Sequence, residues 1–239
     1  MNAHDWILVA IAYASEVLGT ISGFGSSTFF IPSALFFESF YFVLALTAIL
    51  HCFGNFFKIT LFRDSIDWKL LWKLTIPAII FTGIGALLSN KIPSENLKRV
   101  LGVVLVIIPL LKLLNIYKLK KISITTGMTL VAISGLLTGL VGTGGAVRGL
   151  ALSALQVHKN AFVLLSASID MGADLIRAII YIKQGYMDWD QWFYIPLLLV
   201  VALTGAYTGK LILKRINQKQ FEVIVGIFIV ISGFMMLFE

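Results

Sequence analysis

Two short glycine-rich stretches carry the residue types best suited to bind a small ligand. Each combines glycines with hydroxyl side chains inside an apolar run of the sequence. Glycine interrupts a helix because it is a poor helix former. The helix that follows then directs free N–H groups and the positive end of its dipole at the interruption, which suits a small oxyanion. The candidate ligand-binding residues are Gly23, Gly25, Ser26, Ser27, Thr28, Thr143, Gly144 and Gly145.

An alternative interpretation is that these small residues only allow helices to pack closely, as they do in many membrane proteins. The two stretches occupy equivalent positions in an internal repeat, which favours a shared binding site over packing alone. Pro32 adds a second alternative, because a proline often marks the start of a helix.

Arg148 follows the second stretch, three residues after Gly145. An arginine within the membrane usually faces a partner or a cavity. Its guanidinium can bind a sulfonate or carboxylate through two hydrogen bonds. We therefore expect Arg148 to contact a substrate. The alternatives are that it reaches the membrane surface, or that it pairs with Glu16 or Asp170.

Other charged residues also interrupt the apolar runs. Lys58 and Arg177 occupy matching positions in the repeat, and Asp174 lies three residues before Arg177, a spacing that predicts an ion pair on one helix face. Glu16 and Asp170 are then the carboxylates that have no assigned partner. Buried carboxylates can carry protons, so proton coupling is one hypothesis for them and structural pairing is the other.

An enzymatic interpretation is weaker. Gly23–Ser26, with His51 or His158 as a base, resembles the surroundings of the nucleophile in an intramembrane serine protease. The spacing is not specific, however, and Ala146 stands where the repeat would duplicate the nucleophile. The stretch that begins at Gly142 lacks the Lys-Ser/Thr of a phosphate-binding loop. We predict no enzyme activity, no metal site and no cofactor.

The composition places these residues in a membrane protein. The chain has 239 residues, of which 59% are hydrophobic and 13% are charged, and its mean hydropathy is +0.94. Soluble domains carry roughly 25% charged residues. We interpret the net charge of +7 as basic loops that face the cytoplasm, and not as a surface for nucleic acid. The sequence thus predicts a multi-pass protein of the cell membrane.

The chain contains an internal repeat. Gly19–Gly25 aligns with Gly139–Gly145, and Asp67-Trp68 aligns with Asp188-Trp189. We predict a single all-α transmembrane domain over 1–239, with repeat one at about 1–117 and repeat two at about 122–239. Each repeat is expected to hold one glycine-broken segment and three helices. The broken segments are 6–37 and 124–157, and the helices are 39–62, 69–90, 97–117, 160–183, 190–212 and 220–238.

The basic residues of the loops discriminate between two topologies. If all eight segments cross the membrane, the Lys and Arg residues divide equally between its two sides. If the two broken segments are re-entrant, the division becomes twelve to four, which agrees with the positive-inside rule. Three crossings per repeat would make the two repeats inverted, an arrangement that recurs in transporters. This topology places the C-terminus outside the cytoplasm.

Both glycine motifs resemble those of the sulfite exporter TauE/SafE family, the TSUP transporters. They read Gly23-Phe-Gly25-Ser-Ser-Thr-Phe-Phe-Ile-Pro32 and Ser134-Gly-Leu-Leu-Thr-Gly139-Leu-Val-Gly-Thr-Gly-Gly145-Ala146. The duplicated layout and the length also match, so the resemblance covers the whole chain. The sequence departs from the family pattern where Ser26, Ser27 and Ala146 replace glycines and where Leu152 replaces a proline.

The resemblance implies export of a small organic or sulfur-containing anion, such as sulfite, a sulfonate or sulfoacetate. The expected mechanism is secondary transport by alternating access, with proton coupling left open. A passive anion channel is the main alternative. The expected partners are the anion and the lipid bilayer, with no nucleic acid, and a homodimer is left open.

Overall fold

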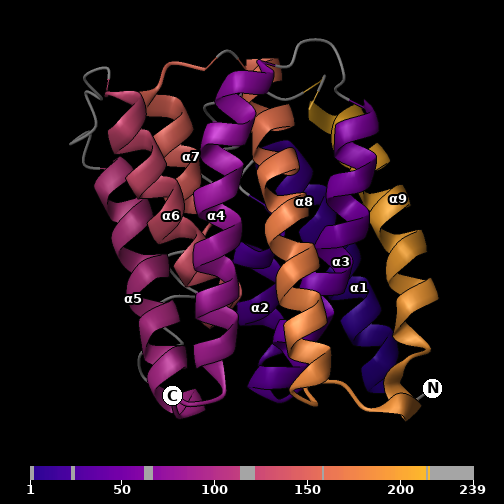
Figure 1. Cartoon of the computed structure of the whole chain (residues 1–239). Helices are drawn as coiled ribbons and strands as arrows, with labels where there is room; N and C mark the ends of the chain where they lie inside the picture. Colours follow the sequence, from indigo (N-terminus) through magenta and orange to yellow (C-terminus); the bar gives the residue numbers. More distant parts are fainter. Residues whose placement is uncertain are drawn as a thin grey trace.

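The computed structural model of the chain describes residues 3–22, 25–61, 67–113, 122–157, 159–213 and 215. Within these ranges every regular element is a helix and no strand occurs, in agreement with the all-α prediction. The long helices run along one common axis (Figure 1). The elements are α1 (Ala3–Ser22), α2 (Ser27–Ala34), α3 (Phe40–Leu61), α4 (Trp68–Ser89), α5 (Ser94–Leu113), α6 (Ile124–Val141), α7 (Gly145–Ala154), α8 (Lys159–Lys183), the 3-10 turn η1 (Trp189–Gln191) and α9 (Tyr194–Leu213).

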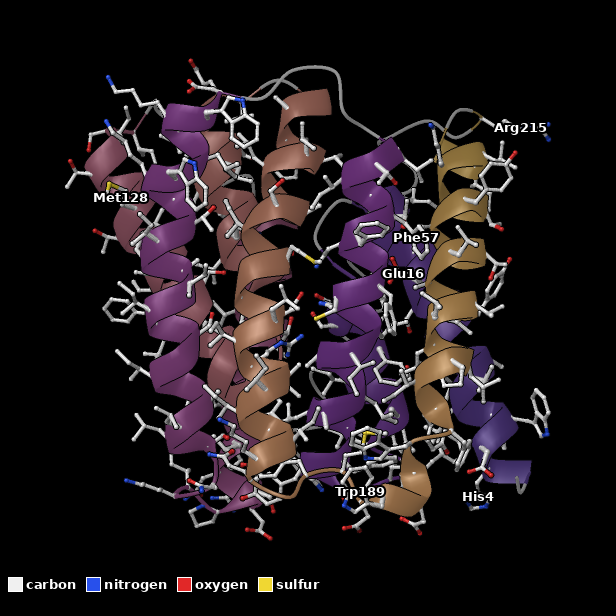
Figure 2. All side chains as sticks on the ribbon, turned by 45° about the vertical axis from the view of Figure 1, so that its right-hand side comes forward. His4, Glu16, Phe57, Met128, Trp189 and Arg215 are labelled. Carbon is white, nitrogen blue, oxygen red and sulfur yellow. The ribbon has the colours of Figure 1, made fainter. Side chains whose placement is uncertain are left out.

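Four described segments are long and apolar enough to cross a bilayer. They are Phe40–Leu61, Trp68–Ser89, Ile124–Val141 and Trp189–Ile212. Exposed tryptophans stand at both ends of the bundle, where Trp68 begins α4 and Trp189 lies at the lower end of Figure 2. Tryptophan is enriched at the two surfaces of a membrane, so this distribution fits a protein that spans it.

Five of the six predicted uninterrupted helices are present as α3, α4, α5, α8 and α9. The largest difference at a helix start is in α9, which begins at Tyr194 after η1 and not at 190. Pro196 then lies in the first turn of α9, where a missing N–H is tolerated. The sixth predicted helix, 220–238, lies outside the described residues, as does the C-terminus.

The first broken segment forms a helical hairpin, here called hairpin 1 (α1 and α2). Gly19 lies directly against the backbone of Ser26, so α2 turns back along α1. The ring of Phe37, just after α2, then lies 6.3 Å from that of His4 in the first turn of α1. Both ends of hairpin 1 therefore meet at the lower end of the bundle, where Figure 2 shows His4.

The second broken segment forms hairpin 2 (α6 and α7), which opens at the opposite end. The Ile122 N–H, before α6, donates to the carbonyl of Ala154 at the end of α7 at 3.2 Å. Met128, early in α6, lies at the upper end of the bundle (Figure 2). The turns of the two hairpins therefore point toward each other inside the protein.

Close packing holds these hairpins in place. Gly139 and Gly135 of α6 lie against the backbone of α4, and Thr82 Oγ1 donates to the Gly135 carbonyl at 3.1 Å. A side chain at Gly139 would collide with that backbone, so this glycine serves helix packing, as the alternative interpretation proposed.

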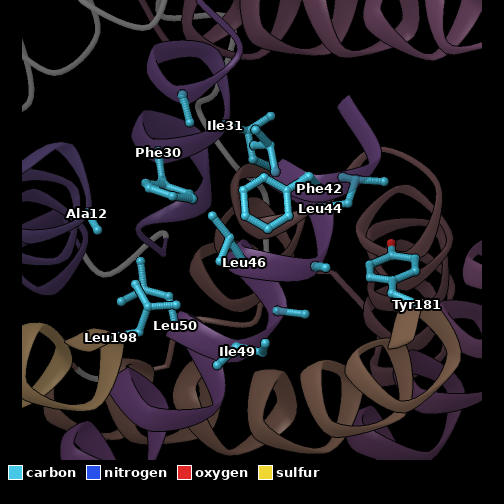
Figure 3. Close-up of a cluster of buried hydrophobic side chains, with 14 of the residues drawn as sticks. Ala12, Phe30, Ile31, Phe42, Leu44, Leu46, Ile49, Leu50, Tyr181 and Leu198 are labelled. Atoms are coloured by element: carbon cyan, nitrogen blue, oxygen red, sulfur yellow. The ribbon is translucent and has the colours of Figure 1, made fainter. Parts of the chain in front are cut away.

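Hairpin 1 is fixed by apolar contacts. All but one of the residues of α2 are buried, and Phe30 and Ile31 pack near Phe42, Leu44 and Leu46 of α3 (Figure 3). Pro32 lies inside α2, which begins five residues earlier, so the alternative that Pro32 marks a helix start is wrong.

Candidate functional site

The turns of the two hairpins contact each other through the predicted hydroxyl residues. Ser27 Oγ donates to Thr143 Oγ1 at 3.2 Å, and Thr28 Oγ1 lies 3.3 Å from the same oxygen. Positive φ angles at Gly25 (+96°) and Gly142 (+80°) allow these two turns, because L-residues with a side chain rarely adopt that conformation. The structure thus brings the two glycine motifs together in the interior.

An ion pair joins hairpin 1 to α3. Lys58 Nζ lies 2.6 Å from Glu16 Oε1, and Ser26 Oγ donates to Glu16 Oε2 at 2.6 Å. All three side chains are buried. Glu16 had no assigned partner in the sequence interpretation, and the structure corrects this by pairing it with Lys58. The pair forms because the returning chain places α1 beside α3.

A second ion pair joins hairpin 2 to α8. Both terminal nitrogens of Arg148 contact the carboxylate of Asp170, one on each oxygen, and Arg148 Nε donates to Ser166 Oγ at 3.0 Å. Asp170 is therefore paired with Arg148, as one of the alternatives for that arginine proposed. The guanidinium of Arg148 is thus held by Asp170 in this structure, and its contact with a substrate stays a prediction.

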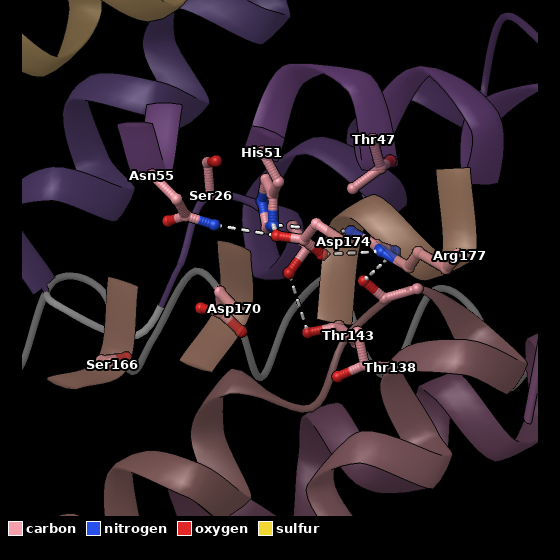
Figure 4. Close-up of polar contacts among 12 residues, drawn as sticks. Ser26, Thr47, His51, Asn55, Thr138, Thr143, Ser166, Asp170, Asp174 and Arg177 are labelled. Atoms are coloured by element: carbon pink, nitrogen blue, oxygen red, sulfur yellow. Dashed lines mark hydrogen bonds and ion pairs between the residues drawn. The ribbon is translucent and has the colours of Figure 1, made fainter. Parts of the chain in front are cut away.

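A third polar cluster is centred on Asp174. The predicted ion pair is present, with Arg177 Nε donating to Asp174 Oδ1 at 2.8 Å. Asn55 Nδ2 donates to Asp174 Oδ2 at 2.8 Å, and His51 Nδ1 lies 3.4 Å from the same oxygen (Figure 4). Arg177 Nη1 also donates to the Gly142 carbonyl at 3.0 Å, so the cluster ties the turn of hairpin 2 to α3 and α8.

A small cavity lies among hairpin 1, α3 and α8. Its polar lining comes from Thr20, Asn55, Lys58, Ser166 and Asp170. The cavity measures about 10 Å³, room for about one water molecule. Thr20 Oγ1 is buried and has no hydrogen-bond partner among the described residues. A buried hydroxyl without a partner is energetically unfavourable, so this one is available to a ligand.

Comparison with known families now bears on this arrangement. The model of the sulfite exporter TauE/SafE family matches residues 7–236, a range that includes hairpin 2, all of hairpin 1 after its first four residues, the three ion pairs and the cavity. The chain belongs to the sulfite exporter TauE/SafE family. This confirms the resemblance read from the two glycine motifs and makes the chain a member of a family of membrane transporters. No curated protein and no solved structure matches the chain.

Within this TauE/SafE protein, most of the predicted site residues come together. Gly23 lies outside the described residues. Gly144 caps the start of α7, where its carbonyl accepts a hydrogen bond from Ser134 Oγ at 2.7 Å, and Gly145 is the first residue of that helix. The structure places these residues, but their role in binding a substrate stays a prediction.

Sequence reasoning assigned no function to His51 and did not identify Thr20 or Ser166. One signal was present for α3, because His51, Asn55 and Lys58 recur at intervals of four and three residues and so share a helix face. The same spacing places Thr20 one turn after Glu16 on α1. A polar stripe of this kind on an apolar helix marks the face that lines the interior.

Proposed function

We propose that this TauE/SafE protein is a secondary transporter that moves a small sulfur-containing or organic oxyanion across the cell membrane. The observation that supports this most strongly is the contact between the two hairpin turns beside a small cavity with polar side chains in its lining. Membership of the family provides the substrate class, which includes sulfite, and the cavity provides cationic and hydroxyl groups that suit an oxyanion.

We further propose that the two repeats are inverted. Hairpin 1 opens at the lower end of the bundle and hairpin 2 at the upper end. The helices that follow them, α3 and α8, run antiparallel. This is seen from their contacts, in which Asn55 meets Asp174 and the earlier His51 meets the later Arg177. Broken helices from the two repeats that meet near the midplane recur in transporters with inverted repeats. In this arrangement the hairpins are the re-entrant elements.

The arrangement also supports alternating access. Among the described residues, three cations and three carboxylates are buried in the interior, and each is paired with an opposite charge. The cavity has room for about one water molecule, so it must widen before a sulfur oxyanion enters. Rocking of one repeat against the other would open the cavity to each side in turn. The carboxylates of Glu16 and Asp170 are candidates for proton coupling.

A ligand screen of the purified protein tests this function. The thermal unfolding midpoint is measured in detergent with sulfite, sulfoacetate, methanesulfonate or chloride, at two pH values. A ligand that binds only the folded protein raises the midpoint. We expect stabilisation by sulfite or a sulfonate and none by chloride at the same ionic strength. Equal midpoints with all of these anions would contradict the proposed function.

A further inference from the structure

Glu16 occupies a slot that two glycines create. A Cβ atom on Gly54 of α3 would lie 2.5 Å from Glu16 Oε1, and one on Gly205 of α9 would lie 2.9 Å from Glu16 Cβ. Both distances are shorter than ordinary contacts, so neither position accepts a larger residue without displacing Glu16. The slot holds the carboxylate against Lys58, where Ser26 supplies a hydrogen bond to its second oxygen.

Lys58 contacts Glu16 and also lines the cavity. Its ammonium contacts Glu16 Oε1, and its side chain also lines the cavity together with Asn55 and Thr20. Thr20 Oγ1 has no hydrogen-bond partner among the described residues although it is about 99% buried. The cavity thus presents a cation, an amide and an unused hydroxyl, which is a set of groups that recognises an oxyanion.

Charge balance limits how an anion can enter here. The Glu16–Lys58 pair is neutral as it stands, and a buried charge without a partner is strongly unfavourable. An added monoanion would leave one negative charge uncompensated. The balance is restored if one proton enters with the anion.

Resting on the transport function proposed above, we infer that Lys58 binds the transported monoanion in place of Glu16, while Glu16 takes up the proton that travels with it. In this step Glu16 Oε1 gains a proton and becomes a neutral acid. Lys58 keeps its charge and pairs with the anion in the cavity, where Asn55 and Thr20 complete the contacts. The local charge is zero before and after the exchange, so the exchange is electroneutral.

The other groups around Glu16 neither take up the proton nor bind the anion. Ser26 faces it from the turn of hairpin 1, Gly54 from α3 and Gly205 from α9, and none of them carries a charge. Asp170 of α8 lines the same cavity, but both of its oxygens are held by Arg148. A guanidinium keeps its charge and binds a carboxylate in a fixed fork, whereas an ammonium on a flexible stem can change partner.

The dependence of anion affinity on pH tests this inference. The probe is methanesulfonate, whose charge stays at −1 between pH 5 and pH 8; if only sulfite stabilises the protein, sulfite is used with a correction for its own protonation. One proton taken up per anion strengthens binding about tenfold for each unit by which the pH falls, wherever Glu16 is ionised in the free protein and protonated in the complex. We expect this slope for the unmodified chain.

Three variants accompany the measurement. Glu16→Gln should bind the probe with an affinity that no longer changes with pH, because the amide takes up no proton. Glu38→Gln, the matched control at the lower end of the bundle, should keep the slope. The double variant Glu16→Gln/Lys58→Met removes both charges of the pair and should fold, since loss of a whole buried pair is often tolerated, yet bind no probe.

The outcomes separate this inference from the proposed function. If the unmodified chain binds no sulfur oxyanion at any pH, the proposed function fails and the inference fails with it. If the chain binds the probe without a pH slope, or if Glu16→Gln keeps the slope, only the coupling through Glu16 is wrong. Binding that survives in the double variant would show that Lys58 is not the anion site.

Discussion

The Glu16 side chain fits its position only because the neighbouring residues Gly54 and Gly205 have no side chain. Gly54→Ala would place a methyl group 2.5 Å from Glu16 Oε1. Overpacking of this kind destabilises by about 1–3 kcal/mol. We therefore expect a lower thermal unfolding midpoint and loss of anion binding, measured on the detergent-purified protein.

Gly83→Ala is the matched control for that change. Gly83 also lies within a long apolar helix, α4, but its nearest neighbour would be Ile176 Cγ2 at an ordinary 3.5 Å. Alanine is the better helix former by about 1 kcal/mol, so the midpoint should stay the same or rise. If both variants behaved alike, the slot around Glu16 would have no special role.

The Asp174–Arg177 pair supports a second prediction at the residue scale. Asp174→Leu alone leaves a buried guanidinium without its counter-ion, and removal of one partner of a buried pair costs about 3–5 kcal/mol. Arg177→Met alone should have a similar effect. The double variant should be less destabilised than the sum of the two, because no uncompensated charge remains.

A double-mutant cycle of unfolding free energies measures this coupling. Strict additivity of the two single changes would show that the contacts to Asn55 and to the Gly142 carbonyl, and not the ion pair, stabilise the cluster.

At the residue scale, the sequence predicts the local pair, offers the Arg148–Asp170 pair only as an alternative, and misses the Glu16–Lys58 pair. Asp174 and Arg177 lie three residues apart on one helix, so helical geometry alone brings them together. Glu16 meets Lys58 only because hairpin 1 returns to its starting point, and Arg148 meets Asp170 only because hairpin 2 does the same. A linear spacing does not contain that information.

At the scale of the helices, the contribution of the hairpin 2 turn to stability can be tested. Gly142 ends α6 with a φ of +80°, and a Cβ there would lie 2.5 Å from Ile31 and 2.6 Å from Leu44. Gly142→Ala therefore combines backbone strain of about 1–2 kcal/mol with overpacking of about 1–3 kcal/mol. We expect a large fall in the unfolding midpoint.

Gly185→Ala separates these two contributions. Gly185 has nearly the same φ, +76°, but nothing lies within 4 Å of the position of its Cβ. This variant should show the backbone strain alone and keep anion binding. If the unfolding midpoint fell as far as it does for Gly142→Ala, the collision of the added methyl group with Ile31 and Leu44 would add nothing to the backbone strain.

The sequence predicts the elements well because glycine acts locally. The interruptions between α1 and α2 and between α6 and α7 lie where the glycine stretches predict them. What each glycine does depends on its neighbours, however. Gly142 supplies a turn, whereas Gly139, three residues earlier, supplies close packing against α4, and only the packed structure separates these two uses.

At the scale of the whole molecule, the basic residues predict the orientation in the membrane. Lys69 lies in the first turn of α4 at the upper end, and Lys91 follows the same helix at the lower end. The smaller group of basic residues lies at the lower end, after α4, early in α5 and at the end of α8; it consists of Lys91, Lys98, Arg99 and Lys183. The positive-inside rule therefore predicts that the upper end faces the cytoplasm.

Labelling of single cysteines checks this orientation. The single native cysteine, Cys52, is first replaced by alanine. In right-side-out vesicles, a cysteine at position 91 should react with a membrane-impermeant maleimide, and one at position 69 should react only after the membrane is opened. The reverse pattern would contradict the orientation, and equal labelling of both would indicate dual topology.

Transport itself tests the central claim most directly. Purified protein is reconstituted into liposomes, and uptake of radiolabelled sulfite is followed over a range of concentrations. We predict uptake that saturates, that excess sulfonate inhibits and chloride does not, and that Lys58→Met abolishes. Uptake no greater than in liposomes without protein, or a flux that rises linearly with concentration and also carries chloride, would contradict a sulfur-oxyanion transporter.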